Sequence, residues 1–116
     1  MERDCALELV MAESHPIDRL FAVVQSRKDG DPASSYTAKL FSQGTLKIAK
    51  KLGEEGVETA LAAVGQDKQC LIAESADLLY HLLVLWAACG VTPDEAYAAL
   101  EARVGRSGLD EKNGRG

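Results

Sequence analysis

The sequence predicts an all-α fold, an antiparallel helix bundle in which two long central helices are flanked by shorter ones. Three observations favour this fold class. Apolar residues recur with helical periodicity along most of the 116 residues. Sustained alternation of apolar and polar residues, which would indicate half-buried strands, is nearly absent. Stretches that contain glycine or proline separate the helical segments.

The first helix is predicted after an N-terminal extension of residues 1–13, so a single domain is expected to span residues 14–116. Ser14 is expected to cap this helix, with Pro16 in its first turn. Apolar residues then follow at i, i+3, i+4 and i+7, which indicates one amphipathic helix ending near Ser26. These residues are Ile17, Leu20, Phe21 and Val24. The next stretch, RKDGDPASS, is a predicted loop.

A short helix is predicted from about Ser35 to Ser42, with Gly44 interrupting it. Thr45 is expected to cap the first long helix, which runs to about Val64. The residues GQDK then form a turn.

The second long helix is predicted from about Lys68 to Ala88, with Gly90 as its C-terminal stop. Because only a short turn joins the two long helices, they are expected to be antiparallel neighbours. The sequence TPDE, residues 92–95, is a capping box with proline at the first helical position, and it begins a last helix that reaches about Arg103. The glycine-rich, charged tail GRSGLDEKNGRG is expected to be loop.

Composition limits the possible partners. The chain has 13 basic and 18 acidic residues, a net charge of −5, which argues against nucleic-acid binding because that requires a basic patch. A small anionic substrate stays possible, since a bound divalent cation reverses the local charge. A chain this short buries a modest fraction of its surface, and self-association is a common remedy.

The three cysteines, Cys5, Cys70 and Cys89, are too far apart for a zinc site or a disulfide framework. They are expected to be buried small hydrophobes in a reducing compartment. The N-terminus lacks the basic region of a secretory signal. The longest apolar run, Leu78–Val91, is shorter than the roughly 20 residues of a membrane span. The expected location is therefore the cytoplasm, without a membrane partner.

Acidic side chains occupy core-facing positions on both long helices. On the first, Glu55 shares a stripe with apolar residues, Glu58 lies beside it one turn on, and Glu54 lies further round. On the second, Glu74 and Asp77 are the only charged residues between positions 71 and 89. A helix that is apolar almost all round should be buried, so these two acids should be buried with it.

Buried carboxylates are costly unless something compensates their charge. One possibility is a set of basic partners, for which Lys47, Lys50 and Lys51 are candidates. The other is a divalent cation, Mg²⁺ with Mn²⁺ as an alternative, held where the two acidic pairs converge between antiparallel helices. An ordinary solvated face is a third interpretation, and it suits the pair on the first helix far better than the pair on the second.

A cation held by carboxylates keeps positions for water and for substrate phosphates. It polarises a phosphoryl oxygen, and lysines just upstream can neutralise phosphate charge. The residues by themselves therefore favour a Mg²⁺-dependent hydrolase of phosphoanhydrides and do not name its substrate.

Two stretches, KIAKKLGEEGVETALAA and ESADLLYHLLVLW, resemble the phosphoribosyl-ATP pyrophosphatase family of histidine biosynthesis. That family belongs to the all-α, MazG-like NTP pyrophosphohydrolases, whose signature is E-E-x-x-E … E-x-x-D. The stretches SYTAKLF and GRSGLDEKNGR also look like this family, and the resemblance covers roughly residues 16–115. It implies Mg²⁺-dependent hydrolysis of phosphoribosyl-ATP to phosphoribosyl-AMP and pyrophosphate by a homodimer whose second copy completes the bundle.

The resemblance also implies roles for individual residues. Its metal ligands would be Glu55, Glu58, Glu74 and Asp77, and Glu54, Glu55 and Glu58 would be its catalytic carboxylates, with Glu54 helping to activate water. The phosphates would face Lys47, Lys50 or Lys51, and the helical wheel favours Lys51 and Lys47.

Further candidates lie outside the acidic helices. Arg27 and the segment of Ser34, Ser35, Tyr36 and Thr37 are candidates for phosphate or ribose contacts, and helix capping is an equal alternative. Arg106, Ser107 and Lys112 lie in a tail that either closes over substrate or is solvated.

His81 is either a partner of Asp77 or a buried histidine with one hydrogen bond. Trp86 is expected in the core or at a dimer interface. Gly56 stands where the family often has alanine, so with Gly53 nearby the first acidic helix is expected to bend or loosen locally.

Two alternative functions stay open. One is a house-cleaning (d)NTP pyrophosphohydrolase of the same superfamily. The other is a non-catalytic helical dimerisation module whose acids are held by lysine salt bridges.

Overall fold

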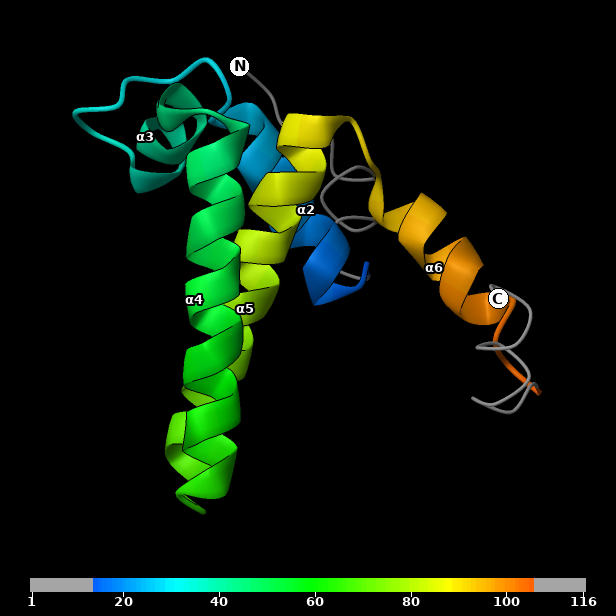
Figure 1. Cartoon of the computed structure of the whole chain (residues 1–116). Coiled ribbons are helices and arrows are strands. Elements are labelled where there is room, and N and C mark those ends of the chain that lie inside the picture. The colour runs from blue at the N-terminus through cyan, green and yellow to red at the C-terminus, as the bar shows by residue number, and fades with distance from the viewer. Residues whose placement is uncertain (1–13, 106–116) are drawn as a thin grey trace.

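The computed structural model describes residues 14–105. The predicted N-terminal extension and the tail residues Arg106, Ser107 and Lys112 lie outside this range. Within it the chain forms five helices and no strand, which confirms the predicted all-α class (Figure 1). The helices are α2 (Pro16–Ser26), α3 (Tyr36–Gln43), α4 (Thr45–Val64), α5 (Lys68–Cys89) and α6 (Pro93–Glu101).

The two long helices α4 and α5 lie side by side as an antiparallel hairpin and share the most extensive contact between elements. The turn end of this hairpin projects beyond the other helices, whereas α2 and α3 pack near its opposite end (Figure 1). The last helix, α6, diverges from the bundle and contacts α2. The short turn predicted between the long helices is therefore confirmed, together with their antiparallel arrangement.

Local capping explains most helix ends. Thr92 and Glu95 form the predicted capping box, and Gly90 ends α5 in the left-handed region at φ 73°. Two predicted caps are wrong. His15 caps α2, because its Nδ1 accepts the Ile17 N–H, a role expected of Ser14. Gly44 precedes α4 at φ 88° without a side-chain cap, and Thr45 is the first helical residue.

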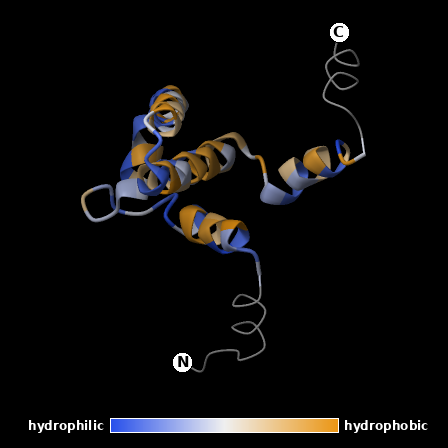
Figure 2. Ribbon diagram, turned by 90° about the horizontal axis from the view of Figure 1, so that it is seen from below, coloured by the Kyte–Doolittle hydropathy of each residue, from blue (hydrophilic) through white to orange (hydrophobic). Residues whose placement is uncertain are grey.

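The core lies where α2, α3, α4 and α5 meet. Its most deeply buried side chains are Val24, Leu40, Ile48, Leu83 and Val84. Hydrophobic residues predominate along α5 (Figure 2), yet its buried residues lie only between His81 and Ala87. The expectation that α5 is buried all round is therefore wrong for this chain. α4 is the helix that contacts α5 most extensively, and Ile72 and Leu79 on α5 stay about half exposed.

Side-chain bonds fix the shorter helices on the hairpin. Lys28 Nζ donates to the Ala87 carbonyl oxygen at 3.0 Å, which places a cation at the C-terminal end of α5. The hydroxyls of Thr37 and Tyr80 lie 2.5 Å apart and join α3 to α5. These bonds position the start of α3 beside the middle of α5.

Two further expectations concern the burial of the cysteines and the absence of a membrane-spanning helix. Cys70 and Cys89 are free and exposed, so the expectation of buried cysteines is wrong for both. α5 has 22 residues and, by length and composition alone, could cross a membrane. The core helix of a soluble protein passes the same test, so this is weak evidence, and α5 here carries Glu74 and Asp77.

Candidate metal centre

Three carboxylates converge between α4 and α5. One oxygen each from Glu55, Glu58 and Glu74 lies within 4.8 Å of the others. Glu55 and Glu58 are one turn apart on α4, and the antiparallel α5 brings Glu74 opposite them. The structure thus brings together three of the four expected metal ligands.

The backbones of the two helices are joined at the same level by Thr59. Its Oγ1 lies 2.7 Å from the Glu55 carbonyl oxygen on α4 and 3.1 Å from the Glu74 carbonyl oxygen on α5. A hydroxyl has one hydrogen, so it donates to one carbonyl at a time or shares its hydrogen between the two. Thr59 lies one turn after Glu55 on α4, and no local signal in the sequence shows that it bridges two helices.

Two of the three carboxylates, Glu55 and Glu74, are partly withdrawn from water, whereas Glu58 is exposed. Glu55 Oε2 and Glu74 Oε2 are buried and have no hydrogen-bond partner. Within residues 14–105, none of the three clustered carboxylates forms an ion pair with a lysine or arginine. The nearest recorded pair, Lys51 with Glu54 at 3.9 Å, lies outside the cluster. Lysine salt bridges therefore do not compensate these acids in the described chain.

Burial and the crowding of negative charge raise the pKa of one of these carboxyls, Glu74. Burial raises the pKa of the Glu74 carboxyl above its usual value of 4.5, and the negative charges of Glu58, Glu55 and Asp77 raise it further. Glu74 consequently loses its proton more reluctantly than an isolated glutamate does. A cation between the acids would reverse this effect, because it favours the charged form.

Asp77 is placed differently from its expected position. It is exposed and lies outside the group of three, so the expectation that it is buried with Glu74 is wrong. It follows Glu74 by three residues, which turns it about 60° around α5 from Glu74. Its backbone carbonyl oxygen contacts Nδ1 of His81 at 2.9 Å. Asp77 still lies close enough for its charge to act on Glu74.

The arrangement fits a hard divalent cation. Three carboxylates supply hard oxygen ligands, which suit Mg²⁺ or Mn²⁺. The two buried, unpartnered oxygens of Glu55 and Glu74 are the atoms that such an ion would satisfy. α4 is one uninterrupted helix through Gly53 and Gly56, so Glu55 and Glu58 lie one turn apart on it.

The basic residues expected to contact phosphate lie on α4 before the clustered glutamates and at the end of α2. Lys47 and Lys50 are exposed on the first half of α4, and Lys51 lies one turn before Glu55. Arg27 is exposed at the C-terminal end of α2.

The hydroxyl residues before and in α3 are mostly engaged in local bonds. Ser35 Oγ accepts the Ala38 N–H, and Ser34 Oγ donates to the Asp31 carbonyl oxygen. The capping interpretation of this segment is therefore confirmed for Ser35.

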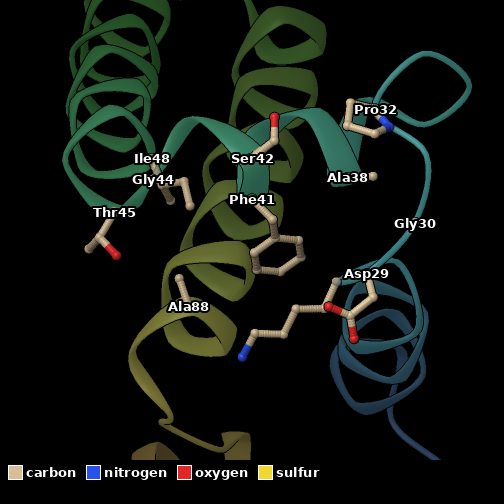
Figure 3. A pocket seen from close by; sticks show the side chains of 11 residues that line it. Asp29, Gly30, Pro32, Ala38, Phe41, Ser42, Gly44, Thr45, Ile48 and Ala88 are labelled. Carbon is tan, nitrogen blue, oxygen red and sulfur yellow. The ribbon is translucent and has the colours of Figure 1, made fainter.

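A separate cavity of about 320 Å³ lies between the loop after α2 and the start of α4 (Figure 3). Phe41 and Ile48 form part of its apolar wall, and Lys28, Asp29 and Thr45 contribute polar groups. None of the clustered glutamates lines it. It lies toward the N-terminal end of α4, whereas Glu55 and Glu58 lie in the helix's middle.

Known proteins match this chain along most of its length. The family model described as phosphoribosyl-ATP pyrophosphohydrolase matches residues 17–104. A phosphoribosyl-ATP pyrophosphatase of Azospirillum brasilense is 58% identical over 99 residues, which cover 85% of this chain and 89% of the relative. That of Parvibaculum lavamentivorans is 55% identical over 105 residues, covering 90% and 96%. The matched region contains the clustered carboxylates.

Proposed function

Since the chain belongs to the phosphoribosyl-ATP pyrophosphohydrolase family, we propose that it hydrolyses 1-(5-phosphoribosyl)-ATP to 1-(5-phosphoribosyl)-AMP and pyrophosphate, the second step of histidine biosynthesis. The phosphoanhydride link between the α- and β-phosphoryl groups breaks, and one water molecule supplies the atoms that complete both products. The observation that carries the proposal is the convergence of Glu55, Glu58 and Glu74 between α4 and α5.

Glu55, Glu58 and Glu74 would hold a Mg²⁺ ion, with Mn²⁺ as a substitute, and Asp77 lies one turn along α5 as the fourth candidate ligand. When bound, the ion supplies a Lewis acid for a phosphoryl oxygen and a water of lowered pKa. Glu54 is exposed beside the cluster and is assigned the role of orienting water. Its bond to Lys51 keeps the two charged groups next to each other.

Lys51 and Lys47 would neutralise the substrate's phosphates. Both lie on α4 before the acids, one and two turns from Glu55 in the direction of α3. An ammonium group is a mobile point charge and suits phosphate groups that move as the product leaves. Lys50 is a weaker candidate because it points further round the helix, and Arg27, Arg106 and Lys112 are candidates from other segments.

A second copy of the chain is the proposed partner, and the proposed location is the cytoplasm. The projecting half of the hairpin exposes large apolar side chains that this chain alone leaves in water: Val57, Leu61, Val64 and Ile72. Exposed apolar area of this kind is typical of interfaces. A homodimer that covers it would also reduce water access near Glu74. Sedimentation analysis is expected to give twice the chain mass.

The test is release of pyrophosphate from phosphoribosyl-ATP in the presence of Mg²⁺. Wild type and Glu55→Gln are compared, and Glu101→Gln, an exposed acid at the end of α6, is the matched control. We expect turnover by wild type and the control and loss of about 100-fold or more in Glu55→Gln.

Ordinary nucleotides separate the alternatives. Efficient turnover of dUTP or dCTP with none of phosphoribosyl-ATP would favour a house-cleaning enzyme. If no substrate is turned over and Mg²⁺ does not bind, the chain is a non-catalytic dimerisation module and the proposal fails.

A further inference from the structure

Three aromatic rings meet where the start of α3 touches the middle of α5. The ring centroids of Tyr36 and Tyr80 lie 6.4 Å apart with their planes inclined by 25°. The His81 ring stands nearly perpendicular to both, 6.3 Å from Tyr36 and 5.0 Å from Tyr80. This group, Tyr36 with Tyr80 and His81, is called the aromatic corner below.

Two of the three rings are fixed by their surroundings. The Tyr80 hydroxyl is bonded to the Thr37 hydroxyl at 2.5 Å. His81 is only 5% exposed, and its Nδ1 donates to the Asp77 carbonyl oxygen at 2.9 Å, since a carbonyl can only accept. Neither ring can turn freely, so together they form a rigid support on α5.

The third ring, Tyr36, is the exposed member. Its exposed fraction is 52%. In the segment from Ser34 to Thr37, the three hydroxyls on either side of it are all engaged in bonds within the chain. No hydrogen bond of the Tyr36 side chain is recorded in the part of the chain that the structure describes, so packing against the supporting rings is what holds it.

One member of the aromatic corner, His81, lies on the same side of α5 as Glu74. His81 follows Glu74 by seven residues, which is two helical turns and about 10 Å along the axis. Lys47 and Lys51 lie on the neighbouring stretch of α4, because that helix runs antiparallel to α5. Thr59 lies opposite Glu74 and Gly56 lies beside Leu78, so Lys51 is near the level of the rings and Lys47 lies beyond them. From the turn end of the hairpin the acids come first and the rings follow, in the order in which a nucleotide presents its phosphates and then its base.

We infer that Tyr36, supported by Tyr80 and His81, is a specificity-determining residue that stacks on the adenine ring of the substrate. The inference rests on the proposed function, because it places that substrate's phosphates at Glu55, Glu58 and Glu74. Aromatic side chains stack on any nucleobase, so stacking alone supplies affinity without selectivity.

The chemistry of the substrate supplies the selectivity. An adenine that carries a ribosyl group on N1 is a stronger base than ordinary adenine and holds a proton at neutral pH, which makes the ring a cation. A cation over the face of a tyrosine ring is attracted by the ring's negative face. Tyr36 therefore favours phosphoribosyl-ATP over ATP, although the two share the same triphosphate.

The test compares Tyr36→Leu, which removes the aromatic face, with Tyr36→Phe, which keeps it. The first readout is binding of 1-methyladenosine monophosphate and of AMP to each full chain by calorimetry. We expect wild type and Tyr36→Phe to bind the methylated nucleotide more tightly than AMP. Tyr36→Leu should lose about 5- to 100-fold of the affinity for the methylated nucleotide.

The second readout is the kinetics of phosphoribosyl-ATP hydrolysis. KM should rise in Tyr36→Leu by a similar factor, with kcat changed less, while Tyr36→Phe stays near wild type. Thermal melting checks that the leucine variant folds, as expected for a half-exposed position.

The two proposals can fail separately. If wild type does not hydrolyse phosphoribosyl-ATP, the proposed function fails and the binding measurement still decides the role of Tyr36. Equal affinities for the methylated nucleotide in Tyr36→Leu and Tyr36→Phe overturn the inference. The inference is also overturned if the wild-type chain binds AMP as tightly as 1-methyladenosine monophosphate, or if it binds neither nucleotide.

Discussion

The hydroxyl oxygen of Thr59 on α4 lies 3.1 Å from the backbone carbonyl oxygen of Glu74 on α5. This contact joins the two helices at the level of the clustered carboxylates. It holds the backbone of one candidate metal ligand against the helix that carries the other two, and it does so without using a carboxylate oxygen.

Thr59→Val is therefore expected to weaken the hairpin. Valine keeps the shape of threonine and removes the hydroxyl, so unfolding in urea should show a loss of about 1 kcal/mol. Thr59→Ser is the matched control, because it keeps the donor. Equal stability of the valine variant and wild type would show that the contact contributes nothing.

Glu74→Gln is expected to separate stability from metal binding. Without divalent cations the variant should melt at a higher temperature than wild type, because one of the crowded charges is removed. Addition of Mg²⁺ should raise the melting temperature of wild type and have a much smaller effect on the variant. A variant that is less stable than wild type in EDTA would contradict this account, and Glu101→Gln controls for the loss of any surface acid.

The stability of the metal-free protein is expected to depend on pH through Glu74. Its pKa is raised in the folded chain, so the folded state binds this proton more tightly than the unfolded state does. The resulting stabilisation is fully present below the unfolded value near 4.5 and is lost as the pH rises through the folded pKa.

Urea denaturation in EDTA between pH 4 and pH 8 measures this dependence. The advantage of Glu74→Gln over wild type should be small at the acidic end and should grow toward neutral pH. A constant difference across this range would show that Glu74 does not titrate differently on folding.

Gly56→Ala is expected to stabilise the chain by about 1 kcal/mol, the usual gain inside a helix. A methyl group at Gly56 would lie 3.9 Å from Leu78 Cδ1, which is an ordinary contact. Gly44→Ala is the contrasting variant, since φ is 88° there and alanine should destabilise. Thermal melting of both variants gives the comparison, and a destabilised Gly56→Ala would mean that Leu78 cannot adjust.

The helices, and the acidic pairs within them, follow from local patterns in the sequence. Helical periodicity and the spacing of Glu55 with Glu58 are local properties, and each depends on residues three or four positions apart. The capping box at Thr92 and the glycine stop at Gly90 are equally local. The short turn after α4 then forced the antiparallel hairpin, which is why convergence of the acids was predictable.

Which groups meet, and how far they are buried, depends on how the helices pack against one another. Asp77 is exposed because burial depends on which side of α5 other elements cover, and α5's own pattern does not contain that information. The caps at His15 and Gly44 depend on the direction in which the chain enters each helix. Tyr36 meets Tyr80 and His81 because the loop after α2 returns the chain to α5, a contact between residues more than 40 positions apart.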